Sequence, residues 1–338
     1  MNAIPPTAAA RLHSEALVWD NHACLPHERA LDFLPEIARY KAAGVDVLGL
    51  NVGDSNIGLE DLVRLAAKIR WYVGLHPDQY RMVRDADDIR EAKAAGRMAV
   101  LLNIEGCFAM GDQISLISFF HDMGVRWMAM VYNRRNLVGS GVHDDADEGL
   151  TAFGREVVAE MDRVGMLKCC SHTGYRTAMD VFAATSRPTI FSHSNPLALR
   201  DHPRNIPDDL IRACAATGGV IGLNGVGIFL GDNDIRPDTL ANHADHVAQL
   251  VGAAHVGLGL DAVFDQTGMD QALAENGHLW PPQFGYRPGI GFFQPEQLPD
   301  LTESLLQRGW RESDVRGLLG ENLLRVAGQV WPAARAPA

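Results

Sequence analysis

The sequence predicts an α/β protein that folds as a (β/α)8 TIM barrel. Eight apolar, strand-like runs alternate along the chain with helix-like segments of suitable length. Two of these runs, residues 166–170 and 188–191, are each followed within two residues by a histidine, His172 and His193. The C-terminal ends of barrel strands open on one face, where active sites are built. Both histidines are therefore expected to face a common mouth.

Length and composition limit the class of protein. The 338 residues suit a single barrel, so one domain over residues 1–338 is expected. The net charge of −12 argues against nucleic acid or an anionic membrane as a partner, because both require a basic surface. The five cysteines show no CxxC spacing, which makes a disulfide framework unexpected and favours a reducing cytoplasm. Residues 1–10 have no signal-peptide core, and no apolar run is long enough to span a membrane.

The first strand is expected within residues 17–26. Alternation along it places His22 and Cys24 on the same side. Helical spacing over 37–43 stops at Gly44, and residues 45–52 form a second buried strand. Helices over 59–73 and 87–95 then precede a very apolar strand, 98–104, which ends at Glu105.

The second half of the chain repeats the pattern. An amphipathic helix over 114–123 leads to a strand over 126–131, which ends at Tyr132. After a polar loop, the expected helices cover 150–164, 174–185, 208–217 and 239–251, and the strands between and after them cover 166–170, 188–191, 220–224 and 255–260. The last two of these strands end at Asn224 and Asp261.

The segment after Asp261 is too irregular for one element. Residues 262–294 are expected to form a loop over the mouth of the barrel. C-terminal helices are expected over about 295–330, in the two stretches 295–307 and 312–330, and the tail 332–338 is expected to lack regular structure.

The polar residues at the strand ends form a set that is typical of a metal site. Imidazoles and carboxylates suit zinc, and a carboxylate between two histidine-bearing walls can bridge two ions that share and acidify one water. A single histidine after a strand is more often a satisfied packing residue, but three histidines and two carboxylates at one mouth favour a metal site. The set comprises His22, Cys24, Glu105, Tyr132, His172, His193 and Asp261. The histidines assigned instead to surface or packing positions are His13, His27, His76, His121, His143, His243, His246, His255 and His278.

Eight short motifs, in order along nearly the whole chain, are individually weak but jointly specific. They lie at residues 20–26, 103–106, 149–158, 171–172, 191–194, 202–205, 218–220 and 321–326. Together they resemble the membrane dipeptidase (renal dipeptidase) family of zinc metallopeptidases, peptidase family M19. The resemblance implies an amidohydrolase-like barrel of the metal-dependent hydrolase type. It also implies cleavage of dipeptides, with a D-residue tolerated on the carboxyl side.

The resemblance implies a metal-binding role for several strand-end residues. His22 matches a ligand of the first zinc, and Glu105 matches the carboxylate that bridges both ions. His172 and His193 match the ligands of the second zinc. Two zinc ions are therefore expected, with a single ion as the alternative.

The resemblance also implies roles in catalysis and substrate binding. Asp261 matches the acid that orients the metal-bound water and shuttles its proton, beside Glu105 and Tyr132 as the other catalytic residues. Arg204, in His-Pro-Arg-Asn, resembles the residue that clamps the substrate carboxylate, a role that suits a guanidinium fork. Asn224 and Tyr132 are assigned to substrate binding together with Arg204.

Two positions depart from the family pattern. The family has His-x-Asp on the first strand, whereas this chain has His22-Ala23-Cys24. A thiolate would keep the site intact and favour soft metals; the alternative is a small buried cysteine beside a weak or empty first site. Tyr132 replaces a histidine, so it can donate a hydrogen bond to an oxyanion without carrying a positive charge.

The leading hypothesis is a metallo-dipeptidase that cleaves the amide bond of a small dipeptide-like substrate with a metal-activated water. One alternative is an amidohydrolase-like hydrolase of a different small amide or lactone. Another is a metal-poor, ligand-binding homologue. The sequence leaves open the substrate side chains, and it leaves open a homodimer.

Overall fold

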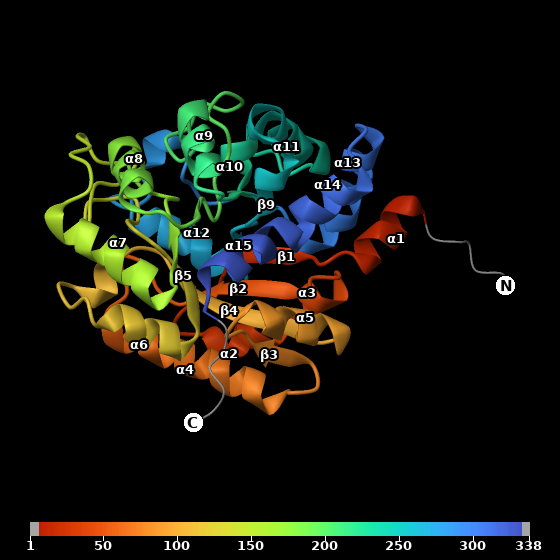
Figure 1. Ribbon diagram of the computed structural model, residues 1–338, viewed down its shortest axis with the longest axis horizontal. Coiled ribbons are helices and arrows are strands. Elements are labelled where there is room, and N and C mark those ends of the chain that lie inside the picture. Colours follow the sequence, from red (N-terminus) through yellow and green to blue (C-terminus); the bar gives the residue numbers. More distant parts are fainter. Residues whose placement is uncertain (1–6, 333–338) are drawn as a thin grey trace.

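The computed structural model describes residues 7–332, and its centre is a curled sheet of parallel strands with helices around it (Figure 1). Seven strands follow one another in the order β10-β1-β2-β4-β5-β6-β7, and β3 pairs with β4. Strands β8 and β9 form a separate parallel pair. The strands are β1 (Trp19–Cys24), β2 (Val47–Asn51), β3 (Tyr80–Met82), β4 (Met98–Ile104), β5 (Val125–Ala129), β6 (Leu167–Cys169), β7 (Thr189–Ile190), β8 (Ile221–Leu223), β9 (Val256–Leu258) and β10 (Ala262–Val263).

Backbone contacts close these two sheets into a ring. A parallel bridge between Phe191 and Ile221 joins the end of β7 to β8. On the other side, β10 directly follows β9 in the chain and pairs with β1, and the Asp261 N–H donates to the carbonyl of His22 (2.9 Å). Eight sides therefore surround the core, with β9 and β10 sharing the last one, and the predicted (β/α)8 barrel is confirmed.

Fifteen α-helices are described between residues 7 and 332, most of them in the connections between strands (Figure 1). Side-chain caps explain several of the boundaries: Thr151 accepts from Gly154 N at the start of α7, and Asp85 accepts from two backbone amides at the start of α5. The helices are α1 (Ala8–Glu15), α2 (Ala30–Phe33), α3 (Ile37–Ala42), α4 (Leu59–Leu75), α5 (Ala86–Ala94), α6 (Leu116–Met123), α7 (Ala152–Val164), α8 (Tyr175–Ala184), α9 (Asp208–Ala216), α10 (Gly227–Leu230), α11 (Pro237–Val251), α12 (Gln266–Glu275), α13 (Leu298–Gln307), α14 (Glu312–Arg316) and α15 (Asn322–Val330).

The structure differs from the sequence-based expectation in several places. The segment 262–294 contains the short strand β10 and the helix α12, where only an irregular loop was expected. The expected helix over 312–330 is divided into α14 and α15 by a kink at Gly320. A Cβ on Gly320 would lie 2.5 Å from the carbonyl oxygen of Leu17, so the kink lets the chain pass close to the start of β1. Elements α1, α2, α10 and β3 were not expected at all.

None of the helices between residues 7 and 332 is long and apolar enough to cross a membrane. Of the tail that was expected to lack regular structure, residues 333–338 lie outside the described part of the chain, as do residues 1–6.

Apolar side chains fill the interior of the barrel at the end where the strands begin. Large apolar side chains from several strands, Trp19 and Trp127 among them, form one buried cluster with Leu323 and Val326 of α15, which covers that end. Trp127 also packs against the ring of His22, with ring centroids 5.4 Å apart. The opposite end of the barrel is left for polar side chains.

Two glycines allow the strands to approach closely beside His193. A Cβ on Gly222 would lie 2.2 Å from the carbonyl oxygen of Ser192, and a Cβ on Gly259 would lie 2.0 Å from the same atom. No real side chain tolerates such distances, so β8 and the residues after β9 can only reach the end of β7 as glycine. The position of His193 depends on this packing.

Gly222→Ala is expected to destabilise the barrel by about 3 kcal/mol or more, because backbone must move to admit the methyl group. The measurement is the thermal unfolding midpoint. Gly74→Ala is the matched control: Gly74 lies in α4, and a methyl group added to it would have no neighbouring atom within 4 Å, so the change should be neutral or stabilising by up to about 1 kcal/mol. Equal midpoints for the two variants would contradict the close approach.

Candidate metal centre

Five strand ends bring polar side chains to the C-terminal mouth of the barrel. His22 lies within β1, Glu105 directly follows β4, and His172 follows β6. His193 follows β7, and Asp261 lies between β9 and β10. The side chains of His22 and His193 are fully buried, and that of Glu105 is 5% exposed.

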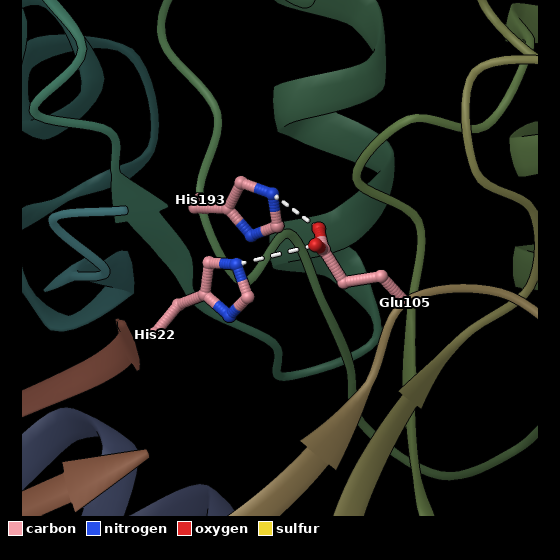
Figure 2. A group of neighbouring side chains, drawn as sticks. All are labelled: His22, Glu105 and His193. Atoms are coloured by element: carbon pink, nitrogen blue, oxygen red, sulfur yellow. Dashed lines mark ion pairs between the residues drawn. The ribbon is translucent and has the colours of Figure 1, made fainter. Parts of the chain in front are cut away.

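The carboxylate of Glu105 points toward the stacked rings of His22 and His193 (Figure 2). Its Oε1 is 2.9 Å from His172 Nε2 and 3.0 Å from His193 Nε2, whereas its Oε2 is 3.5 Å from His22 Nε2. The two oxygens thus contact different histidines. This is the arrangement that a carboxylate needs to bridge two cations.

A second group of ligand atoms shares His22 with the first. Cys24 Sγ lies 3.6 Å from His22 Nε2 and 3.6 Å from Asp261 Oδ1. His22 Nε2 and Asp261 Oδ1 are 3.4 Å apart. Within the described residues, His22, Glu105 and His193 form one compact set of potential ligands, and His22, Cys24 and Asp261 form another.

Hydrogen bonds to the other ring nitrogens orient the three imidazoles. His22 Nδ1 lies 3.1 Å from Asn103 Oδ1, and His172 Nδ1 lies 2.7 Å from Asn133 Oδ1. Because an amide oxygen only accepts, both Nδ1 atoms carry the proton and both Nε2 atoms present a lone pair to the site. His193 Nδ1 lies 2.7 Å from the Ser192 hydroxyl, which fits the same tautomer.

With these tautomers, the Nε2 atoms of His172 and His193 can bind a cation together with Glu105. His172 Nε2 and His193 Nε2 are 2.8 Å apart, and Glu105 Oε1 has no hydrogen-bond donor among residues 7–332. Two lone pairs and a carboxylate oxygen therefore converge without a proton between them, which is costly when buried unless a positive ion fills the space. Tetrahedral zinc with bonds of about 2.0–2.1 Å has ligand atoms about 3.3 Å apart, close to the spacings here.

Charges at the site shift several pKa values. Burial raises the pKa of Glu105, but His22 and His172 outweigh it and hold the pKa well below its usual range. Burial lowers the pKa of His22, but the negative charge of Glu105 and the contacts with Cys24 and Asp261 raise it well above its usual value, so a metal ion at His22 would take the place of a proton on Nε2. Burial also raises the pKa of the Cys24 thiol to about 12, so this thiol needs a cation to become a thiolate.

Backbone strain is concentrated at the same place. Among the described residues other than glycine, four have a positive φ, and three of these lie at the mouth: Asn133 (53°), His172 (66°) and Asp261 (58°). Such conformations cost about 1–3 kcal/mol each and persist where the surrounding structure enforces them. Asn133 and His172 are joined by the hydrogen bond described above, so the strained pair acts as one unit.

Tyr132 lies against His172. Its ring stacks on His172 with centroids 4.3 Å apart, and its hydroxyl accepts a hydrogen bond from Trp280 Nε1 (3.1 Å). Because the indole fills an acceptor position, the phenolic proton remains free to be donated into the cavity. Burial, followed by the charge of Glu105, raises the pKa of Tyr132 well above its usual value, so the proton is retained.

Arg204 is buried at the same mouth and lacks a carboxylate partner among residues 7–332. One guanidinium nitrogen, Nη2, donates to the carbonyl of His193 (3.2 Å), and the guanidinium lies over the ring of Phe229 at 5.4 Å. The other terminal nitrogen, Nη1, has no hydrogen-bond partner. A buried, unpaired guanidinium on a cavity wall is arranged to receive an anion.

Asn224 is placed behind Asp261 rather than on the cavity wall. Its Nδ2 donates to Asp261 Oδ2 (2.9 Å), and its Oδ1 accepts from Val226 N (2.7 Å). Asn224 is fully buried and does not line the cavity. Its hydrogen bond orients Asp261, and the contact of Asn224 with substrate stays a prediction.

A cavity of about 440 Å³ opens over these residues. Glu105, His172, Asp261, Tyr132 and Arg204 contribute polar lining, whereas the segment 262–294 contributes much of the apolar wall, namely Val263, Met269, Ala272, Trp280, Tyr286, Ile290 and Phe292. His27 also lines the cavity, although the sequence had assigned it to the surface or to packing. A cavity with a polar floor and apolar walls suits a small organic substrate.

The sequence matches the family described as membrane dipeptidase (peptidase family M19) over residues 36–276 and 285–337. The chain belongs to this family. The match begins after β1, so the departure at Cys24 lies outside the matched residues.

Curated relatives of the family include fungal dipeptidases. Dipeptidase aclJ of Aspergillus oryzae is 34% identical over 245 residues, which cover 71% of this chain and 53% of that protein. Dipeptidase tcpJ of Claviceps purpurea is 30% identical over 265 residues, covering 77% of this chain and 57% of that protein. The chain therefore matches somewhat more than half the length of these curated relatives.

Solved structures share the whole fold. An amidohydrolase from Pseudomonas aeruginosa is 30% identical, with a TM-score of 0.85, and the alignment covers 96% of this chain and 99% of that one. A metallopeptidase from Rhodobacter sphaeroides, solved with a phosphinate mimic of the dipeptide L-Ala-D-Ala, is 21% identical with a TM-score of 0.73 over 94% of this chain and 99% of that one. This second likeness concerns the fold alone.

Proposed function

We propose that this protein is a metal-dependent dipeptidase that hydrolyses the amide bond of a dipeptide-like substrate. The observation that carries the proposal is the carboxylate of Glu105, whose oxygens face the Nε2 atoms of three oriented imidazoles. Membership of the dipeptidase family supports the reaction class. The cavity above the site is of the size and character that a small substrate needs.

The donor set favours two zinc ions. His22, Cys24 and Glu105 would hold the first ion, and Glu105, His172 and His193 would hold the second. When bound, the ions would acidify a water molecule and polarise the scissile carbonyl. Nitrogen and sulfur ligands favour zinc over the hard ions magnesium and calcium, which prefer oxygen.

Three other residues would transfer the proton of the attacking water, stabilise the oxyanion and bind the substrate carboxylate. Asp261, fixed by Asn224 and close to His22, accepts the proton of the attacking water at Oδ1 and returns it to the leaving amine. Tyr132 donates its phenolic proton in a hydrogen bond to the carbonyl oxygen as negative charge develops there. Arg204 binds the substrate carboxylate through its unpaired Nη1.

Three further expectations form part of the proposal. The chain folds as one domain, and it works in the cytoplasm, which its five free cysteines support. A homodimer also stays a prediction.

The test of the proposed reaction is a hydrolysis screen over L,L- and L,D-dipeptides with the zinc-loaded protein. We expect turnover that a chelator abolishes and zinc restores. Turnover of lactones or N-acyl amides without turnover of any dipeptide would instead support a different amidohydrolase-like activity. Failure to bind zinc would support a ligand-binding homologue.

Cys24→Ser is expected to remove one metal ion while the other stays, because a neutral hydroxyl replaces a thiolate poorly. With cobalt in place of zinc, the thiolate should produce a near-ultraviolet charge-transfer band that is lost in Cys24→Ser and in Cys24→Asp. Cys24→Asp should keep both ions. Cys214→Ala, a buried thiol that donates to the carbonyl of Thr189, is the control and should keep the band. Unchanged metal content and absorption in Cys24→Ser would show that the sulfur is a bystander.

Arg204→Ala is expected to leave metal content unchanged and to lower kcat/KM for dipeptides by roughly two orders of magnitude or more, since losing a buried charge partner costs several kcal/mol. A dipeptide amide, which lacks the carboxylate, should lose much less. Arg236→Ala, with a side chain that is 78% exposed, is the matched control and should retain activity. An equal loss for both substrates would argue against the clamp.

A further inference from the structure

The cavity contains one acidic side chain that neither the metal centre nor an ion pair explains. Asp54 follows β2 by three residues and lines the same cavity as Glu105 and Arg204. Its carboxylate accepts a hydrogen bond from the backbone N–H of Asn56 (2.7 Å). No lysine, arginine or histidine among residues 7–332 lies within ion-pair distance of it.

The other carboxylates of the cavity wall already have partners. Glu105 and Asp261 contact the histidines of the metal centre. Asp265 accepts from Gly268 N at the start of α12 and lies 3.7 Å from Arg29 Nη1. Asp54 is therefore the cavity-lining carboxylate, within the described chain, whose charge has no counterpart.

The cavity offers Asp54 no permanent cation nearby. His27 also lines the cavity, but burial lowers its pKa to about 4, so it is neutral at physiological pH. Among the described residues that line the cavity, this leaves Arg204 as the permanent positive charge. Burial, and next to it the charge of Glu105, raises the pKa of Asp54 to about 6, as expected for a carboxylate that lacks a cation.

Strand order places these two charges on opposite sides of the mouth. Asp54 follows β2, and Arg204 is anchored to the carbonyl of His193, directly after β7. Around the ring β1-β2-β4-β5-β6-β7-β8-β9, β2 and β7 are four positions apart in either direction. The metal centre, built from the ends of β1, β4, β6 and β7, lies in the mouth between them.

A dipeptide at neutral pH carries an ammonium at one end and a carboxylate at the other, with the amide between them. We propose that Asp54 binds the ammonium group of the substrate, opposite the carboxylate site at Arg204, and so selects substrates with a free amino terminus. This inference rests on the proposed dipeptidase function and assigns recognition of the substrate's amino terminus to Asp54. It requires no movement of the metal ligands.

The test compares two phosphinate dipeptide mimics that differ only in the amino group, which one has and the other lacks. Their binding to the zinc-loaded protein is measured by calorimetry, so that the result does not depend on turnover. We expect the wild type to bind the amine-bearing mimic at least about tenfold more tightly, because a charge-assisted contact in a partly buried site is lost with the amine. Asp54→Asn should remove this preference and bind the amine-free mimic as the wild type does.

Controls separate the possible failures. Asp122→Asn, which changes a carboxylate that is 87% exposed on α6, should keep the wild-type preference. Equal affinity of the wild type for the two mimics overturns the role of Asp54, whether or not the variant folds. An undiminished preference in Asp54→Asn overturns it as well. Failure of the wild type to bind either mimic would instead overturn the proposed dipeptidase function.

Discussion

The mouth of this barrel is organised around lone pairs that converge on one another. Glu105 accepts from Asn51 through Oε2 and presents its other oxygen, without a donor, to His172 and His193. The Nδ1 atoms of His172 and His193 are hydrogen-bonded to Asn133 and Ser192, and burial lowers the pKa of both rings. Their Nε2 atoms therefore carry no proton that could relieve the repulsion. The backbone holds this arrangement with strained conformations at His172 and Asp261. A site of this kind is stable only with positive charge in it, which ties the stability of the mouth to its chemistry.

Much of the fold could be predicted because apolar runs of strand length are local in the sequence. The run that became β4, Met98–Ile104, was predicted with its observed boundaries. Helix α12 could not be predicted in this way: Leu273 is its fully buried residue, and the rest of the helix shows no apolar stripe. Strand β3 has three residues and depends on pairing with β4, a contact that the sequence does not disclose.

Some residues of the candidate site could likewise be predicted from the sequence, and others could not. His22, Glu105, His193 and the other strand-end residues were visible because each follows an apolar run. The asparagines that orient the ligands were not, although Asn51, which donates to Glu105, and Asn103, which contacts His22, also lie at or near strand ends. Their roles depend on which strands are neighbours and on how the barrel curves, as in the contact of Asn103 with His22 across 81 positions of sequence. Trp280 likewise reaches Tyr132 from a segment 148 residues away.

The hydrogen bond between Arg204 and the carbonyl of His193 has a consequence for how such a site can diversify. Arg204, which would bind the substrate, and His193, which would bind the metal, lie within one short stretch of chain. A change in the position of one is therefore transmitted to the other. The apolar wall from Met269 to Phe292 contains neither. Apart from Trp280, which contacts Tyr132, substitutions in that wall can therefore alter substrate preference without disturbing the ligands, whereas changes between His193 and Arg204 affect both functions together.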